Sequence, residues 1–258
     1  MTTAAVPGPA EPLRDDTEPA PLRATYVWEL PVRLTHWLIA LSMAILAVTG
    51  IYIGRPFLLA PGAAGEHFVM GWTKAVHLWA AIVFALSVAA RVGWMFAGNR
   101  WASWRQFLPI ERQRWRDIPG TLAFYSLLRS RPPETVGHNP VAGLTYTLVF
   151  VLYLAQIATG LALYSVSAHV ESPLRAFAFL APLFGGLQTA RWIHHVVMWL
   201  LIGFVVHHVQ SAILVSRAER NGILDSIFSG YKFLPRRSAA ERQAERPAER
   251  GAKRGGGR

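Results

Sequence analysis

The chain of 258 residues contains no cysteine and has few charged side chains. The absence of cysteine excludes a disulfide scaffold, a thiol nucleophile and any zinc or iron–sulfur site built on thiolate ligands. Charged residues make up 16% of the chain, against roughly 25% in a typical soluble domain. Hydrophobic residues make up 52%, yet the formal net charge is +11. The positions of these charges therefore decide which function classes remain.

The charges are confined to blocks that leave four long, almost uncharged windows. About 20 mainly apolar residues are enough for a helix to cross a membrane. The windows predict an all-α membrane protein, a bundle of four transmembrane helices at about 34–54, 74–97, 141–165 and 192–216. The alternative, a soluble protein with several buried helices, is disfavoured by four windows of this length. A further apolar segment, 176–190, is short and contains Pro and Gly, which predicts an interfacial loop.

Both ends of the chain differ in composition from the region between them. The first 25 residues contain five prolines and several acids, which predicts a disordered arm. The arm has no apolar segment of the kind that a signal peptide requires. Residues 236–258, rich in Arg, Ala, Glu and Gly, predict a disordered basic tail. The expected organisation is an arm at 1–25, a membrane domain at 26–235 and a tail at 236–258.

Lysine and arginine are distributed unevenly between the two sides of the predicted bundle. Of 26 such residues, 22 belong to the N-terminal arm, the connection between the second and third helices with the helix end before it, and the C-terminal region. The positive-inside rule then places both termini in the cytoplasm, in a multi-pass membrane protein. Because topology accounts for the basic excess, no nucleic-acid partner is expected. The tail is instead suited to anionic lipid.

Six of the nine histidines fall inside the predicted spans. Ionisable residues at membrane depth are costly and mark functional sites. At about 100° per residue, a spacing of 14 returns to nearly the same helix face, and on the fourth helix only His194 and His208 have this spacing. They stand about 21 Å apart along the helix axis. Depth pairs His208 with His36 near the cytoplasm, and His194 with His77 near the outer face.

Two histidines that face each other across a helical bundle can be the axial ligands of a haem. Neutral imidazole ligates iron without adding charge to the lipid. Two such pairs predict two haems with both axial positions filled, which favours electron transfer over reaction at the iron. The alternative is structural histidines hydrogen-bonded between helices, as we expect for His195 and His207. A metal transporter would be expected to add intramembrane Asp or Glu, and the predicted spans contain none.

The same 14-residue step selects residues on the first two helices. His36 leads to Gly50, where the missing side chain would let a flat macrocycle approach the backbone. His77 leads to Arg91, whose guanidinium could pair with a haem propionate. The alternatives are ordinary small-residue helix packing for Gly50 and an interfacial, snorkelling Arg91. Two further basic residues could serve outer propionates: Lys74 and Arg191.

Six short motifs lie between residues 25 and 235: YVWELPVRLTHW at 26–37, MGWTKAVH at 70–77, RVGWMFAGN at 91–99, GHN at 137–139, HHVVMW at 194–199 and IFSGY at 227–231. Together they resemble the b-type cytochrome subunit of membrane-bound nickel–iron uptake hydrogenases. Singly, each also suits the wider group of bacterial cytochromes b561, including di-haem subunits of formate dehydrogenases and thiosulfate reductases.

The resemblance implies a multi-pass subunit of the bacterial inner membrane. It would anchor a hydrogenase, with its small iron–sulfur and large nickel–iron subunits, to the outer face of that membrane. It implies that electrons from H₂ pass through two b haems to a quinone, ubiquinone or menaquinone, and that the four paired histidines are the haem ligands. It also implies a quinone site near the cytoplasmic haem, at Asn139 and His138. The alternative for Asn139, which precedes a proline, is a helix N-cap.

Two departures accompany the resemblance. Members of the family commonly have an aromatic residue two positions after the last haem ligand, where this chain has Gln210, and His207 stands unusually beside His208. Because the chain has no cysteine, any hydrogen chemistry must belong to a partner. The alternatives are an equivalent subunit of another dehydrogenase or reductase, a stand-alone cytochrome b561, and a haem-free structural anchor.

Overall fold

The computed structural model describes residues 22–57, 68–108, 112–130, 139–219 and 222–235. The chain divides into two units, residues 26–232 and residues 1–25 with 233–258. Strands β1 (Leu22–Tyr26) and β2 (Tyr231–Pro235) form a two-stranded sheet. β1 begins four residues before the predicted start of the membrane domain. The rest of the predicted arm and the predicted tail lie outside the described residues.

Four long helices dominate the unit of residues 26–232: α1 (Leu30–Gly54), α2 (Val69–Ala97), α4 (Pro140–Ser165) and α6 (Leu187–Glu219). Each is long and apolar enough to cross a membrane, which confirms the predicted all-helical fold with four such helices and indicates a multi-pass membrane protein. Each helix begins before its predicted window. Three of the predicted windows begin at or directly after a charged side chain, whereas the helices extend through Arg33, Lys74 and Arg191.

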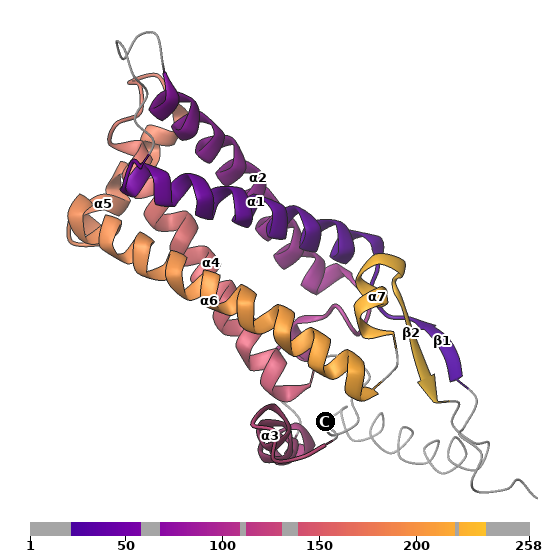
Figure 1. Cartoon of the computed structure of the whole chain (residues 1–258). Helices are drawn as coiled ribbons and strands as arrows, with labels where there is room; N and C mark the ends of the chain where they lie inside the picture. Colours follow the sequence, from indigo (N-terminus) through magenta and orange to yellow (C-terminus); the bar gives the residue numbers. More distant parts are fainter. Residues whose placement is uncertain (1–21, 58–67, 109–111, 131–138, 220–221, 236–258) are drawn as a thin grey trace, which may run out of the picture. The chain divides into compact units, whose positions relative to one another are not determined.

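The long helices are arranged as two hairpins. α1 packs along α2, and α4 packs along α6 (Figure 1). The hairpins meet where α2 approaches α4. Because α1 and α6 belong to different hairpins, side chains that meet between them bring together residues far apart in sequence.

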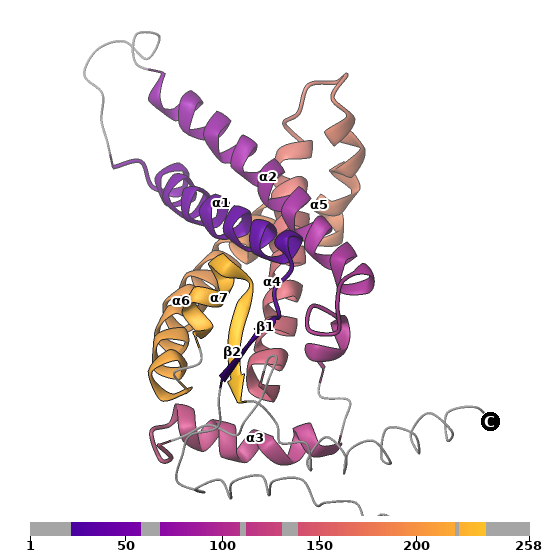
Figure 2. The ribbon, with the colours of Figure 1, turned by 90° about the vertical axis from the view of Figure 1, so that its right-hand side faces the viewer.

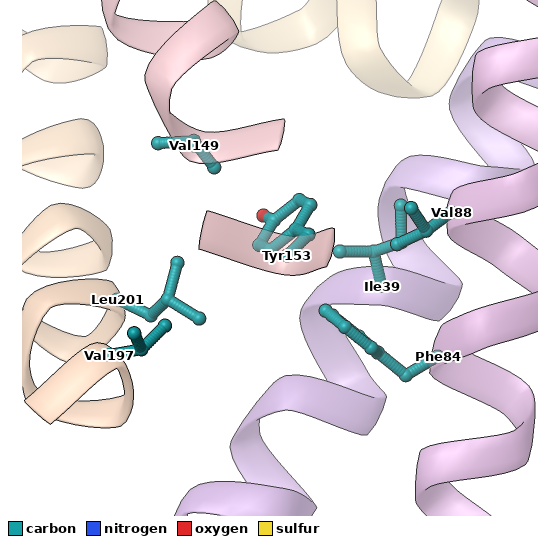
Figure 3. Packing of buried hydrophobic residues seen from close by; sticks show 7 residues of the cluster. All are labelled: Ile39, Phe84, Val88, Val149, Tyr153, Val197 and Leu201. Carbon is teal, nitrogen blue, oxygen red and sulfur yellow. The ribbon is translucent and has the colours of Figure 1, made fainter. Parts of the chain in front are cut away.

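Seven buried side chains from all four long helices form a core cluster midway along the bundle (Figure 3). The rings of Phe84 and Tyr153 meet edge to face with their centres 5.1 Å apart, an arrangement that aromatic rings favour. On α6 the cluster lies between the two paired histidines in sequence. The cluster thus fills the space between the two histidine levels; its members are Ile39, Phe84, Val88, Val149, Tyr153, Val197 and Leu201.

Shorter elements lie at the ends of the bundle. α3 (Arg112–Tyr125), which the sequence did not predict, packs against the start of α4 (Figure 2). The apolar segment predicted as an interfacial loop is partly helical: the 3₁₀ helix η2 (Pro173–Phe179) and α5 (Leu180–Leu183) both contact α4. A second 3₁₀ helix, η1 (Trp104–Gln106), follows α2, and α7 (Ile223–Ser229) follows α6.

A network of hydrogen bonds connects the start of α1 to α7 and to the end of α2. The Trp28 indole donates to Ser226 Oγ at 3.1 Å, and the backbone N–H groups of Val27 and Trp28 donate to the Gly230 carbonyl. The Glu29 carboxylate accepts from the Trp94 indole at 2.9 Å and from a backbone N–H after α2 at 2.8 Å.

Gly230 makes this hydrogen-bond network possible. Its φ of 89° is left-handed, and a Cβ there would stand 2.7 Å from the Trp28 carbonyl oxygen, so only glycine fits without strain. The hydrogen-bond network holds the first turn of α1 in place, and this helix carries His36.

The core cluster gives a stability prediction. Phe84→Ala removes a ring that is 2% exposed and leaves a cavity between α2 and α4, which we expect to lower the free energy of unfolding by about 3 kcal/mol. Thermal unfolding in detergent measures the loss. The matched control is Leu86→Ala on the same helix, where the side chain is 66% exposed. An equal loss in both variants would contradict the assignment of the core.

Candidate functional site

The structure brings His36 and His208 together at one end of the bundle, here named the His36 end. Their ring centres lie 6.3 Å apart, one ring on α1 and the other on α6. The Nδ1 atom of His36 is buried and has no hydrogen-bond partner, which is costly for a polar atom. The spacing and the unpartnered nitrogen both indicate a ligand-binding position.

A metal between two imidazoles fits this spacing. With metal–nitrogen distances of about 2 Å, the centres of two imidazoles on opposite sides of one metal stand roughly 6 Å apart. Among the residues that the structure describes, no three His, Asp or Glu side chains gather as a protein-only metal site would need. A pair of histidines instead suits a metal that brings its other ligands with it, as the iron of a haem does.

Two aromatic side chains surround His208. The Phe204 ring stacks on it with centres 5.4 Å apart, and the Tyr146 ring meets it edge to face at 5.9 Å. The Tyr146 hydroxyl lies 3.4 Å from His208 Nδ1, a long hydrogen bond. This end therefore orients its histidines mainly through packing.

The opposite end, here named the His77 end, holds its histidines by threonine hydroxyls. Thr49 Oγ1 lies 2.8 Å from His77 Nδ1, and Thr159 Oγ1 lies 2.9 Å from His194 Nδ1. Each threonine also donates to the carbonyl four residues earlier in its own helix, at 2.7 Å. Because each hydroxyl proton is used in this way, its oxygen accepts from the imidazole, and the proton of each ring resides on Nδ1. Nε2 then carries no proton, and its lone pair is available to a metal.

A glycine follows each of these threonines and accommodates the neighbouring histidine. A Cβ on Gly50 would lie 3.4 Å from His77 Cε1, and a Cβ on Gly160 would lie 3.4 Å from His194 Cε1. The sequence placed Gly50 at this level, and the structure puts its backbone against the His77 ring. Gly160 plays the matching part on α4 and was not predicted.

Gln156 is a further polar side chain at the His77 end. Its amide nitrogen lies 3.1 Å from His194 Nε2, the ring nitrogen left unprotonated by the bond to Thr159. Its Oε1 atom is buried and has no hydrogen-bond partner. The His77 end thus also contains an unsatisfied buried polar atom beside a histidine.

The three basic residues selected from the sequence have different environments. Arg91 is 7% exposed, donates to the Ala102 carbonyl at 3.5 Å and lies over the Phe107 ring. No carboxylate pairs with Arg91 among the described residues, which is unusual for a buried cation. Lys74 and Arg191 are exposed, and Arg191 donates to the side chain of a residue in its own helix.

Asn139 has the structural role considered for it, since its side-chain oxygen accepts from Ala142 N at 2.7 Å and caps α4. Its amide also donates to the Tyr125 hydroxyl at 2.9 Å. His138 lies outside the described residues. Tyr125 is part of the wall of a groove of about 460 Å³ between α3 and α6. The groove is lined by Tyr125, Leu127, Val206, Val209, Gln210, Ile213, Leu214 and Arg217.

The histidines next to the paired ones bond within their own helix. His195 Nδ1 lies 2.8 Å from the carbonyl of Arg191, and His207 Nε2 lies 3.3 Å from the hydroxyl of Ser211. The expectation of hydrogen bonds between helices was therefore wrong for both. Partners four residues away along α6 are close enough to satisfy these side chains.

Comparisons with known proteins identify the family of the chain. The model of the family described as prokaryotic cytochrome b561 matches residues 27–230. A protein of Cupriavidus necator described as "Probable Ni/Fe-hydrogenase B-type cytochrome subunit" is 37% identical over 216 residues, covering 82% of this chain and 88% of that protein.

Two further relatives have matching descriptions. One from Azotobacter vinelandii, with the same description, is 34% identical, covering 81% of this chain and 88% of its own length. One from Escherichia coli K12, described as "Probable Ni/Fe-hydrogenase 1 B-type cytochrome subunit", is 33% identical, covering 80% of this chain and 90% of its own length. With four apolar helices, two levels of histidines and a family match over nearly all of the described residues, the chain belongs to the prokaryotic cytochrome b561 family.

Proposed function

We propose that this protein carries electrons across the bacterial inner membrane through two b haems, each held by two histidines. The observation that carries the proposal is the 6.3 Å between the His36 and His208 rings, with His36 Nδ1 buried and unpartnered. His77 and His194, 14 residues before Arg91 and His208 respectively, are the ligands at the other end. A haem held by two histidines would supply a one-electron couple and would be suited to electron transfer.

The protein's own residues prepare both positions. The hydroxyls of Thr49 and Thr159 keep the Nδ1 proton in place, so that His77 and His194 would hold a haem iron through Nε2. Arg91, buried without a carboxylate partner in the described part of the chain, supplies a cation for a propionate at the His36 end. Lys74 and Arg191 are exposed and suit propionates at the His77 end.

The sidedness of the chain supports a route from the outside inward. The excess of Lys and Arg favours a cytoplasmic His36 end and an outer His77 end. In this orientation a hydrogenase, with its small and large subunits, delivers electrons at the His77 end and is anchored by this chain. The names of the relatives support such a partner.

A quinone, ubiquinone or menaquinone, accepts the electrons at the His36 end. The groove beside Tyr125 is largely apolar with a few polar groups, the usual character of a site for a small apolar molecule. Asn139 contributes indirectly, because it holds the Tyr125 hydroxyl.

The second candidate is the same electron-transfer subunit serving a formate dehydrogenase or thiosulfate reductase, or acting alone. Isolation of the complex from native membranes separates the two. A hydrogenase large and small subunit bound to this chain supports the first, and a formate dehydrogenase or thiosulfate reductase partner, or none, supports the second. A haem-free structural anchor is the remaining alternative. Purified protein that contains haem contradicts this alternative, and purified protein without haem supports it.

Removing a ligand is expected to remove one haem. His36→Ala and His208→Ala should each reduce haem content from two to about one per chain, because one axial ligand cannot hold the group alone. Haem extraction and dithionite-reduced spectra measure this. The control His195→Ala, whose ring bonds to its own helix, should keep both haems. Unchanged spectra in the His36 and His208 variants would support the haem-free anchor.

Removing the buried cation is expected to change one haem only. Arg91→Met retains the length and apolar stem of the side chain but loses its charge. Loss of a nearby positive charge stabilises the ferric state, so the midpoint potential of one haem should fall. The control is Arg100→Met, whose guanidinium is exposed and lies over the Trp101 ring. Equal potentials in the wild type and Arg91→Met would contradict the pairing of Arg91 with a haem propionate.

Filling the groove is expected to block quinone reduction without disturbing the haems. Ile213→Trp adds a large ring to the groove wall, and we expect quinone reduction to slow several-fold while dithionite still reduces both haems. The control Leu86→Trp places the same ring on an exposed face of α2. Full quinone activity in Ile213→Trp would contradict the groove as the site.

A further inference from the structure

The two helical hairpins repeat one arrangement of residues at a 14-residue step. α1 carries Thr-His at 35–36 and Thr-Gly at 49–50, while α4 carries Thr-Tyr at 145–146 and Thr-Gly at 159–160. On the second helix of each hairpin, a histidine is followed 14 residues later by Arg91 in α2 and by His208 in α6. The first helix of each hairpin thus supplies threonines, and the second supplies a histidine at the His77 end.

The two halves are equivalent at the His77 end. The Thr49–His77 and Thr159–His194 distances are 2.8 and 2.9 Å, and a Cβ added to the glycine after either threonine would lie at the same 3.4 Å from the histidine Cε1. Each threonine donates to its own helix at the same 2.7 Å.

The halves differ at the His36 end. The two histidines there come from non-equivalent helices, so His36 matches Tyr146 in the repeat and His208 matches Arg91. Thr35 and Thr145, although adjacent to His36 and Tyr146, donate only to carbonyls of their own helices. Among the described residues, therefore, no threonine holds a histidine there as Thr49 and Thr159 do. His36 Nδ1 has no partner within that part of the chain, and the contact of His208 Nδ1 is the long one, 3.4 Å, with the Tyr146 hydroxyl.

We propose that Thr49 and Thr159 are positioning residues that make the haem of the His77 end the lower-potential haem of the two. The inference rests on the proposed function. A hydroxyl that already donates to a carbonyl is polarised and accepts more strongly. An imidazole that donates Nδ1–H to such an acceptor is a more basic ligand through Nε2. A more basic ligand stabilises ferric iron, and hydrogen bonding near a haem is one of the protein's means of setting its potential.

The asymmetry gives electron transfer a direction. Both ligands at the His77 end have this acceptor, whereas neither ligand at the His36 end has one of comparable geometry. An electron that enters at the His77 end therefore moves to the higher-potential haem at the His36 end. The repeated Thr-Gly pair thus accounts for both the packing of the histidines and the order of the potentials.

The test is a potentiometric titration of the purified cytochrome, followed by absorbance. Thr49→Val and Thr159→Val keep the side-chain shape and remove the acceptor, so the lower midpoint potential should rise while the higher one stays. The double variant should show roughly the sum of the two shifts. Thr49→Ser and Thr159→Ser retain a hydroxyl and should restore the wild-type value. The single variants each keep one threonine, so the site remains testable if the double variant loses haem.

The matched controls are Thr35→Val and Thr145→Val, because these hydroxyls bond only to their own helix. Both should leave both potentials unchanged. Unshifted potentials in Thr49→Val and Thr159→Val, a shift of the higher potential instead, or equal shifts in the controls would overturn the inference. Wild-type protein without haem would overturn the proposed function itself, whereas two haems with unshifted variants would overturn only the role of the threonines.

Discussion

The structure depends on one constraint: an imidazole inside an apolar bundle must find a partner for each ring nitrogen without help from water. At the His77 end the constraint is met by threonines that are themselves bonded to the backbone, so the ring and its partner belong to the rigid hairpin. At the His36 end it is met incompletely, and one nitrogen of His36 remains without a partner. The fold thus creates two positions of different character from the same kind of side chain.

The core cluster between the two positions has a second role besides stability. Phe84 and Tyr153 meet at the middle of the bundle, where α2 and α4 approach each other (Figure 3). Since protein interiors are close-packed and hardly compressible, this layer fixes how the two hairpins pack against each other between the two levels of histidines. A bundle without it would leave both the separation and the relative rotation of the hairpins undefined.

Much of the fold could be predicted because long apolar windows and a 14-residue step depend only on helix geometry. The meeting of His36 and His208 followed from that geometry. The threonine partners and Gln156 did not, because threonine bonds to its own helix almost anywhere, and only the packing of neighbouring helices shows which hydroxyl also reaches an imidazole. α3 was missed because its helix is amphipathic and basic, so no apolar window marked it.

The hydrogen-bond network around Gly230 joins segments that are translated at very different times. Residues 27–29 precede α1, yet their hydrogen bonds reach Ser226 and Gly230, which are translated nearly two hundred residues later. The two histidine helices of the His77 end are complete before α7 exists, whereas the first turn of α1 is secured only after it. A chain truncated before α7 therefore keeps every histidine of the sequence but lacks the hydrogen bonds that hold the start of α1, the helix that carries His36.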